Sequence, residues 1–161
     1  MGLRKILTDK EPALHKVCRP VDQFNRRLAK LLDDMTETLA EAEGVGLAAP
    51  QVGILRRVVV VDTGEGILEL VNPILLEVSG EQVGAEGCLS VPGKYGLVKR
   101  PMHAKVRAQD RSGEWFEAEG EGLVARCFCH ELDHLDGIVY TQRMERFLTE
   151  EEMNALAEGD D

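Results

Sequence analysis

The stretch HELDH at residues 130–134 lies inside an apolar segment, residues 122–136. This segment has helical spacing and is followed by Gly137, which predicts a helix that ends at this glycine. At about 100° per residue, two histidines four positions apart share one face of a helix, where both imidazoles can reach one metal ion. Glu131 lies at the flank of that face, close to a metal ion without being forced to bind it. The stretch therefore predicts a helix that carries a metal site.

A catalytic metal site of this kind needs a third protein ligand and an open position. The position at which metzincins place a third histidine is Tyr140. Glu151 and Glu152 lie close to the position at which thermolysin-like peptidases place a glutamate. Cys127 is a further candidate because it shares the helical face of the two histidines, and Cys88 is the fourth. The residues alone leave these alternatives open.

Two glycine-rich stretches precede the helix. EGCLSVPG at residues 86–93 contains glycines that let the backbone approach closely, which suits a Cys88 thiolate presented from a strand edge. A buried structural cysteine is the alternative. GVGLAAPQ at residues 44–51 is a loop of small residues that ends in an amide side chain. It does not match a phosphate-binding loop, because no Lys-Ser/Thr follows and Pro50 lacks an N–H donor.

Taken together, these three segments resemble peptide deformylase. The three signature motifs of that family occur here in order, as GVGLAAPQ at 44–51, EGCLS at 86–90 and HELDH at 130–134. The resemblance extends through the flanks, from Ile6-Leu7 to Phe147. It implies a hydrolase that removes the N-formyl group from the initiator methionine of newly made polypeptides and releases formate.

Carried over by position, the resemblance implies a role for each residue of the motifs. The implied metal ligands are Cys88, His130 and His134, with Glu131 as general base and later as general acid. The side-chain amide of Gln51 and the backbone N–H of Leu89 are implied to stabilise the negative charge that develops on the formyl oxygen. The implied substrate-binding residues, which hold the substrate backbone or border the methionine pocket, are Val45, Gly46, Glu86, Leu123, Arg126 and Cys127.

The implied cofactor is one divalent metal ion. Two imidazoles and a thiolate favour zinc over iron by intrinsic affinity. The family resemblance instead implies Fe2+ in the cell, with Zn2+, Ni2+ or Co2+ able to occupy the same site.

The periodicity of the chain predicts an α+β fold in one domain over residues 1–161. In this fold short mixed or antiparallel β-sheets pack around the central helix with the HExxH motif, and a C-terminal helix follows. Asp22 and Gly44 are the expected N-cap and stop of the first helix, and Thr149 with Glu152 forms a capping box before the last one. The predicted helices are 22–42, 122–136 and 149–157, and the predicted strands are 57–62, 67–71, 74–78, 105–109 and 114–118.

Charge and composition exclude several classes of protein. The net charge of −10 argues against DNA binding, since a phosphate backbone requires a basic surface. No apolar run reaches the length of a membrane span, and no secretory signal is recognisable, so we expect a cytoplasmic protein without a membrane partner. We therefore expect the four cysteines to be buried thiols or metal ligands rather than disulfides. The acidic segments 114–121 and 150–161 are expected to be solvated surface.

The expected partners are N-formyl-Met nascent peptides and the ribosome near its exit tunnel. Some members of the family dock on the ribosome through a long basic C-terminal helix, which the short acidic segment 150–161 does not match. Two rival functions remain. A zinc endopeptidase with Glu151 or Glu152 as third ligand would not need Cys88. A non-catalytic metal-stabilised binding protein would need neither Glu131 nor Gln51.

Overall fold

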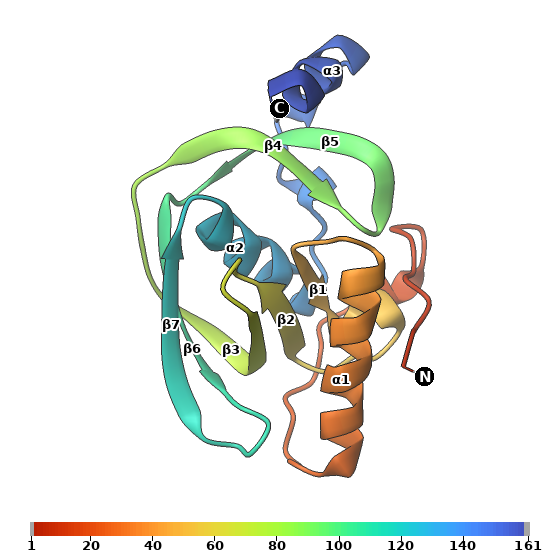
Figure 1. Ribbon diagram of the computed structural model, residues 1–161, viewed down its shortest axis with the longest axis vertical. Helices are drawn as coiled ribbons and strands as arrows, with labels where there is room; N and C mark the ends of the chain where they lie inside the picture. Colours follow the sequence, from red (N-terminus) through yellow and green to blue (C-terminus); the bar gives the residue numbers. More distant parts are fainter. Residues whose placement is uncertain (1, 160–161) are drawn as a thin grey trace.

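The computed structural model describes residues 2–159, and Figure 1 shows its elements. Asp160 and Asp161, the end of the predicted acidic segment, and Met1 lie outside the described residues. The helices are η1 (Pro12–His15), α1 (Arg26–Glu41), η2 (Ala49–Val52), α2 (Leu123–Leu135), η3 (Tyr140–Gln142) and α3 (Glu150–Gly159). The strands are β1 (Gly46–Ala48), β2 (Val58–Asp62), β3 (Ile67–Ser79), β4 (Gln82–Cys88), β5 (Val91–Arg100), β6 (His103–Gln109), β7 (Trp115–Glu121) and β8 (Arg146–Phe147).

The strands form two antiparallel sheets. One has five strands in the order β1-β2-β3-β6-β7 and the other has three in the order β4-β5-β8. In Figure 1, α2 lies in the middle of the molecule, with β4 and β5 passing above it and the larger sheet beside it. This arrangement confirms the predicted α+β fold with antiparallel sheets around the helix that carries HELDH.

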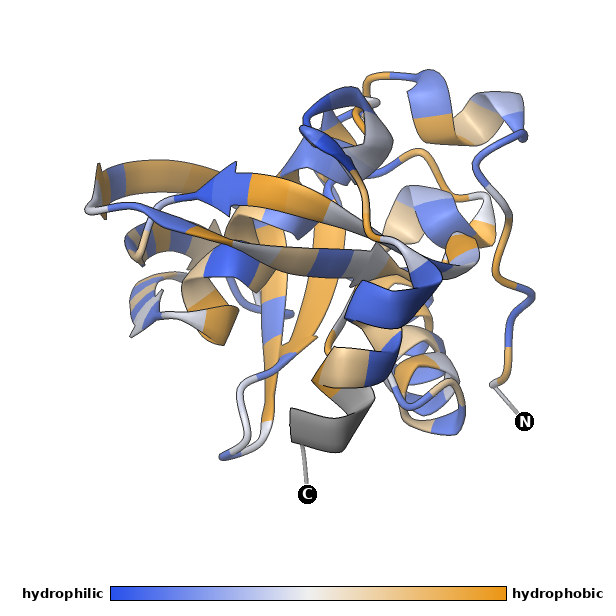
Figure 2. Cartoon of the chain, turned by 90° about the horizontal axis from the view of Figure 1, so that it is seen from above, coloured by the Kyte–Doolittle hydropathy of each residue, from blue (hydrophilic) through white to orange (hydrophobic). Residues whose placement is uncertain are grey.

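The larger sheet is covered by a helix on each face. Because alternate residues of a strand point to opposite faces, the four valines of β2 divide between two cores. Val59 and Val61 join the apolar core that contains α2, whereas Val58 and Val60 join the core that contains α1. Figure 2 shows the matching pattern, with orange strands through the centre of the molecule and mixed colours on the surrounding helices. The first core therefore packs α2 against one face of the sheet, and the second packs α1 against the other.

Helix α1 begins later than the sequence predicts. Its N-cap is Asn25, whose side chain accepts a hydrogen bond from the backbone N–H of Leu28 at 3.2 Å. The prediction of Asp22 as N-cap was wrong, because Asn25 offers the same type of acceptor directly before the first apolar turn. At the other end the chain turns at Glu43, which has a left-handed φ of 55°, and Gly44 follows it.

Strand β3 is one bent strand, where the sequence predicts two short ones. Residues 72 and 73 interrupt its apolar pattern, but the strand continues through a register shift between Val71 and Ile74. Asn72 takes a left-handed φ of 51° at this shift. Its side chain bonds both the N–H and the C=O of Val21, at 2.8 and 2.9 Å. The bend lets β3 pair with β2 in its first half and with β6 in its second.

The C-terminal helix α3 starts at the predicted capping box. The Thr149 N–H donates to Glu152 Oε1 at 2.9 Å, and the Glu152 N–H donates to Thr149 Oγ1 at 3.1 Å. The predicted strands 105–109 and 114–118 are also present, within β6 and β7, which pair antiparallel. Among residues 2–159, no helix is long and apolar enough to cross a membrane.

Candidate metal centre and active site

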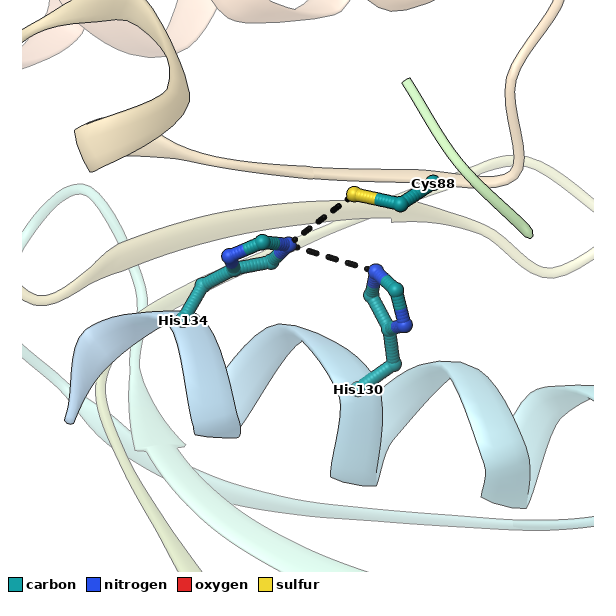
Figure 3. A group of neighbouring side chains, drawn as sticks. All are labelled: Cys88, His130 and His134. Atoms are coloured by element: carbon teal, nitrogen blue, oxygen red, sulfur yellow. Dashed lines mark hydrogen bonds between the residues drawn. The ribbon is translucent and has the colours of Figure 1, made fainter. Parts of the chain in front are cut away.

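Three side chains from two elements converge at the centre of the molecule. Cys88 is the last residue of β4, and His130 and His134 lie one turn apart on α2 (Figure 3). The Nε2 atom of His134 lies 3.3 Å from Cys88 Sγ and 3.2 Å from His130 Nε2. The three ligand atoms all lie within 4.8 Å of one another. This grouping is close enough for one ion to contact all three.

The residues present fit a divalent transition metal. Two imidazole nitrogens and one thiolate form a donor set typical of zinc and iron sites. Burial holds the pKa of His134 well below its usual value, so this imidazole is neutral, as a metal ligand must be. Within the described part of the chain, the buried side-chain atoms without a hydrogen-bond partner are Glu131 Oε1 and His134 Nδ1. Glu131 Oε1 lies on a residue next to the cluster, whereas His134 Nδ1 is on the side of its ring opposite to Nε2, the atom that faces Cys88 and His130.

The other candidate ligands do not join the cluster. Over residues 2–159, the only group of three or more potential ligands is the one formed by Cys88 and the two histidines. Glu152 is occupied by the α3 cap and by an ion pair with Arg146, with an N–O distance of 2.7 Å. Tyr140 lies beside the site: its ring stacks on that of His130 at a centroid distance of 6.1 Å, and its hydroxyl donates to the Lys94 carbonyl at 3.4 Å.

Glu131 is buried next to these three residues. Its side chain is 4% exposed, and its Oε2 atom lies 4.0 Å from His130 Nε2. Burial raises the pKa of Glu131 to about 7. A carboxylate with a pKa near neutrality is suited to take up a proton and give it back. Glu131 is therefore a buried carboxylate directly beside the three candidate ligands.

Gln51 and Leu89 lie beside Cys88. Gln51 ends the GVGLAAPQ segment within η2, where its Oε1 accepts a hydrogen bond from the Ala48 N–H at 2.9 Å. Its Nε2 donates to Ser90 Oγ at 3.1 Å and lies 3.6 Å from Cys88 Sγ. Leu89 lies between the end of β4 and the start of β5. An amide donor and a backbone N–H are thus held beside the candidate ligands.

A cavity of about 460 Å³ opens in front of Glu131 and His130. Its walls come from the segment between α1 and β1, from β1, from β4 and β5, and from the first turns of α2. All six residues predicted to bind substrate line it, namely Val45, Gly46, Glu86, Leu123, Arg126 and Cys127. Lys94 and Tyr95 of β5 also line the cavity and were not among the predicted residues.

Glu86 lines the cavity, and its carboxylate also contacts three buried charged or polar side chains. Its carboxylate accepts hydrogen bonds from His130 Nδ1 at 2.7 Å and from Arg126 Nη1 at 2.9 Å, and it forms an ion pair with Arg100. Burial by itself would raise the pKa of Glu86, but the hydrogen bonds from His130 and Arg100 outweigh it and hold the pKa at about 2. Glu86 is therefore ionised and acts only as an acceptor.

Sequence reasoning missed several residues around the site. Ser90 is fully buried and accepts the hydrogen bond from Gln51. Arg100 pairs with both Glu86 and Asp133. One signal for Asp133 was present, since it lies three residues after His130 and so falls near the same helical face.

Comparisons with known proteins agree with this geometry. The family model described as polypeptide deformylase matches residues 3–150. The chain is 54% identical over 153 residues to a peptide deformylase of Caldicellulosiruptor bescii, covering 95% of this chain and 92% of the relative. It is 51% identical over 159 residues to a peptide deformylase of Acetivibrio thermocellus, covering 99% of this chain and 94% of the relative.

Solved structures give the same result. The crystal structure of a peptide deformylase from Thermotoga maritima superposes with a TM-score of 0.87 at 40% identity, covering 90% of this chain and 99% of that one. A peptide deformylase from Synechococcus elongatus in complex with actinonin superposes with a TM-score of 0.86 at 32% identity, covering 99% of this chain and 86% of that one. The fold, the three converging motifs and the relatives lead to one conclusion: the chain belongs to the polypeptide deformylase family.

Proposed function

We propose that Cys88, His130 and His134 hold the metal ion with which this enzyme works. As a member of its family, the chain removes the N-formyl group from the initiator methionine of newly made polypeptides and releases formate. The observation that carries the ligand assignment is the convergence of a strand-end thiol with the two histidines of α2. The HExxH pattern alone is shared with zinc peptidases, whereas a cysteine as third partner is not the peptidase ligand set.

The cavity holds the substrate by its first residue. The methionine side chain enters the cavity between β1, β4 and α2, where Leu123 and Cys127 supply apolar surface. Gly46 lies at the wall formed by β1, and its backbone N–H holds the substrate backbone. Val45, Glu86 and Arg126 border the same space.

The reaction is the hydrolysis of a linear amide. A bound divalent ion acts as a Lewis acid and lowers the pKa of water to about 7. Glu131 takes a proton from the attacking water as the oxygen–carbon bond forms. It then gives that proton to the amine nitrogen as the carbon–nitrogen bond breaks, so that formate and a free amino terminus result.

Gln51 and Leu89 act on the charge that develops during the attack. Negative charge gathers on the formyl oxygen, and the Gln51 amide and the Leu89 N–H donate hydrogen bonds to it. The contacts of Gln51 with Ala48 and Ser90 fix its amide in advance, so little reorganisation is needed when the charge appears.

The metal in the cell is proposed to be Fe2+, with Zn2+, Ni2+ or Co2+ able to take the same place. The support for Fe2+ is the family resemblance, since intrinsic affinity favours zinc for these donors. Metal analysis of protein purified without oxygen tests this directly. Iron in proportion to protein is the expected result, and zinc as the only metal under those conditions would reject it.

The proposed setting is the cytoplasm, with residues 1–161 acting as one catalytic domain on nascent peptides at the ribosome exit tunnel. Helix α3 has acidic residues in its first turn and no basic residue in its last, so docking through a basic C-terminal helix is not part of this proposal.

Removal of the proton carrier tests the assignment most simply. Glu131→Ala should retain the metal and lose nearly all formate release, because Glu131 is beside the ligands and not one of them. Metal stoichiometry and kcat are measured on one preparation. Loss of the metal in this variant would make Glu131 a ligand and reject the proposed roles.

A further inference from the structure

His130 is held from behind by a buried carboxylate. The Nδ1 atom of His130 lies 2.7 Å from Glu86 Oε2, and the Glu86 side chain is 4% exposed. Both oxygens of this carboxylate accept hydrogen bonds from the Arg100 guanidinium, so the carboxylate is an acceptor toward His130 as well, and Nδ1 of His130 is the donor. In the neutral imidazole the lone pair of Nε2 is then free on the side that faces Cys88 and His134.

Arg100 fixes the orientation of that carboxylate. Its Nε donates to Glu86 Oε1 at 3.0 Å and its Nη2 to Glu86 Oε2 at 2.7 Å, so both oxygens are held by one planar group. The third guanidinium nitrogen, Nη1, donates to Asp133 Oδ2 at 2.8 Å. The Arg100 side chain is 5% exposed.

Asp133, which accepts a hydrogen bond from Arg100, lies on the same helix as His130. It lies on α2 three residues after His130, and its carboxylate also accepts two hydrogen bonds from Arg143, at 2.6 and 3.1 Å. The contacts therefore form a closed circuit from α2 through Arg100 on β5 and Glu86 on β4 back to His130. Any rotation of the Glu86 carboxylate would break contacts at both of its oxygens.

We propose that Arg100 and Asp133 are positioning residues of the metal centre, which hold the Glu86 carboxylate against His130 and so set the direction of His130 Nε2. This inference rests on the ligand role of His130 proposed above. Hydrogen-bond partners behind a metal-binding histidine orient its ring, and their loss weakens metal binding by about 10- to 100-fold. A purely structural ion-pair network would change stability and leave the metal site unaltered.

The chain contains a matched control for this circuit. Arg111 makes the same fork with Glu69, with its Nε 3.0 Å from Oε1 and its Nη2 2.6 Å from Oε2. It also contacts Asp33, at 2.9 Å. This set joins the β6–β7 turn to β3 and α1 and contains no candidate metal ligand. It differs in burial, since the Arg111 side chain is 39% exposed.

The experiment compares Arg100→Lys and Asp133→Asn with Arg111→Lys and Asp33→Asn in the metal-loaded enzyme. Zn2+ affinity is measured by competition with a chelator, and the visible spectrum is recorded for the Co2+-substituted protein. Circular dichroism and thermal unfolding confirm that each variant is folded, and Asp133→Asn keeps the shape of the side chain it replaces. We expect about 10- to 100-fold weaker Zn2+ binding, a shifted Co2+ spectrum and a lower kcat at unchanged KM in the first pair, and wild-type values in the second.

His130→Ala separates a failure of this inference from a failure of the proposed ligand set. Retention of wild-type Zn2+ affinity in His130→Ala would overturn both. If His130→Ala loses the metal while folded Arg100→Lys and Asp133→Asn keep the Zn2+ affinity and Co2+ spectrum of the wild type, only the positioning role is overturned. Equal losses in the Arg100→Lys and Arg111→Lys variants would overturn it as well.

Discussion

Gly46 and Glu131 approach each other so closely that a Cβ on Gly46 would lie 2.7 Å from Glu131 Oε2. The same Cβ would lie 2.6 Å from Cys127 Sγ. Strand β1 and helix α2 thus meet at a point where only glycine fits, directly beside the proposed general base. The contact connects the first signature motif to the third.

Gly46→Ala should therefore displace Glu131 without unfolding the protein. The atoms that a methyl group would meet are the ends of two side chains, which can move, so the fold and the metal should be retained. A displacement of about 1 Å at the reacting groups can lower turnover about 100-fold. Measurement of kcat and metal content on the same preparation checks this. Full turnover in Gly46→Ala would show that the position of Glu131 does not limit the reaction.

The raised pKa of Glu131 predicts how stability depends on pH. In the metal-free protein burial raises this pKa from 4.5 to about 7, so the folded state favours the protonated carboxyl. The resulting stability is fully present below pH 4.5 and is lost as the pH rises through about 7. Glu131→Gln should remove this dependence and be more stable than the wild type at pH 8, by on the order of 3 kcal/mol.

Urea unfolding of both metal-free proteins at pH 4.5 and pH 8 measures the effect. The difference in the free energy of unfolding between Glu131→Gln and wild type should change from pH 4.5 to pH 8. An equal difference at both pH values would contradict the assigned pKa.

Gln51→Leu should lower kcat while leaving the metal bound. The variant removes the amide that donates to the formyl oxygen, and loss of one such donor costs about 2.7–4 kcal/mol, or about 100- to 1,000-fold in rate. Gln51→Glu tests the same point with an acceptor of similar shape. Steady-state kinetics with a formyl-Met peptide, together with metal analysis, distinguishes loss of the donor from loss of the ion. A kcat within threefold of wild type in both variants would exclude Gln51 from catalysis.

Helix α3 should contribute little to turnover. Truncation after Ala157 is expected to leave formate release and metal content unchanged, since the proposed ligands lie elsewhere. Removal of Thr149 onward deletes the cap and the partly buried Met153, but Leu156 is 45% exposed. The expected cost is about 1 kcal/mol, below the 1.5–3 kcal/mol of a fully buried side chain. Thermal unfolding measures it, and loss of turnover in the folded truncated protein would show a catalytic contribution of this helix.

The acidic character of α3 also predicts its behaviour at the ribosome. An acidic segment gains nothing from contact with ribosomal RNA phosphates, so truncation after Leu148 should leave ribosome affinity unchanged. Co-sedimentation at two salt concentrations tests this. A salt-sensitive loss of binding on truncation would indicate that α3 contacts a basic ribosomal protein.

Local signals predicted the elements that depend on local sequence. Helix α2 and the capping box of Thr149 and Glu152 follow from spacing and hydrogen-bonding groups within a few residues of each other. The start of α1 was misplaced because Asp22 and Asn25 are equally good caps, and only packing selects between them. The continuity of β3 depends on contacts of Asn72 with Val21, which are far away in sequence.

The candidate site shows the same division. The ligands and Glu131 lie within short motifs, and their types and spacing identify them. The residues of the circuit behind His130 do not lie within one short motif. Arg100 on β5 contacts Glu86 on the neighbouring strand β4, and it contacts Asp133 on α2. Apart from the strand edge expected at Cys88, strands β4 and β5 were not among the predicted strands, since their glycines weaken the alternating pattern. The support of the site is thus a property of long-range pairing.

The role of Cys88 is the central claim, and one measurement tests it directly. Wild-type protein, Cys88→Ser and Glu152→Ala are purified without oxygen and assayed for bound metal and for formate release from a formyl-Met peptide, with Cys18→Ser and Cys129→Ser as controls. The expected result is loss of metal and activity in Cys88→Ser alone, because a hydroxyl replaces a soft thiolate ligand. Full metal content and activity in Cys88→Ser, with loss of both in Glu152→Ala, would contradict the account and indicate a peptidase-type site.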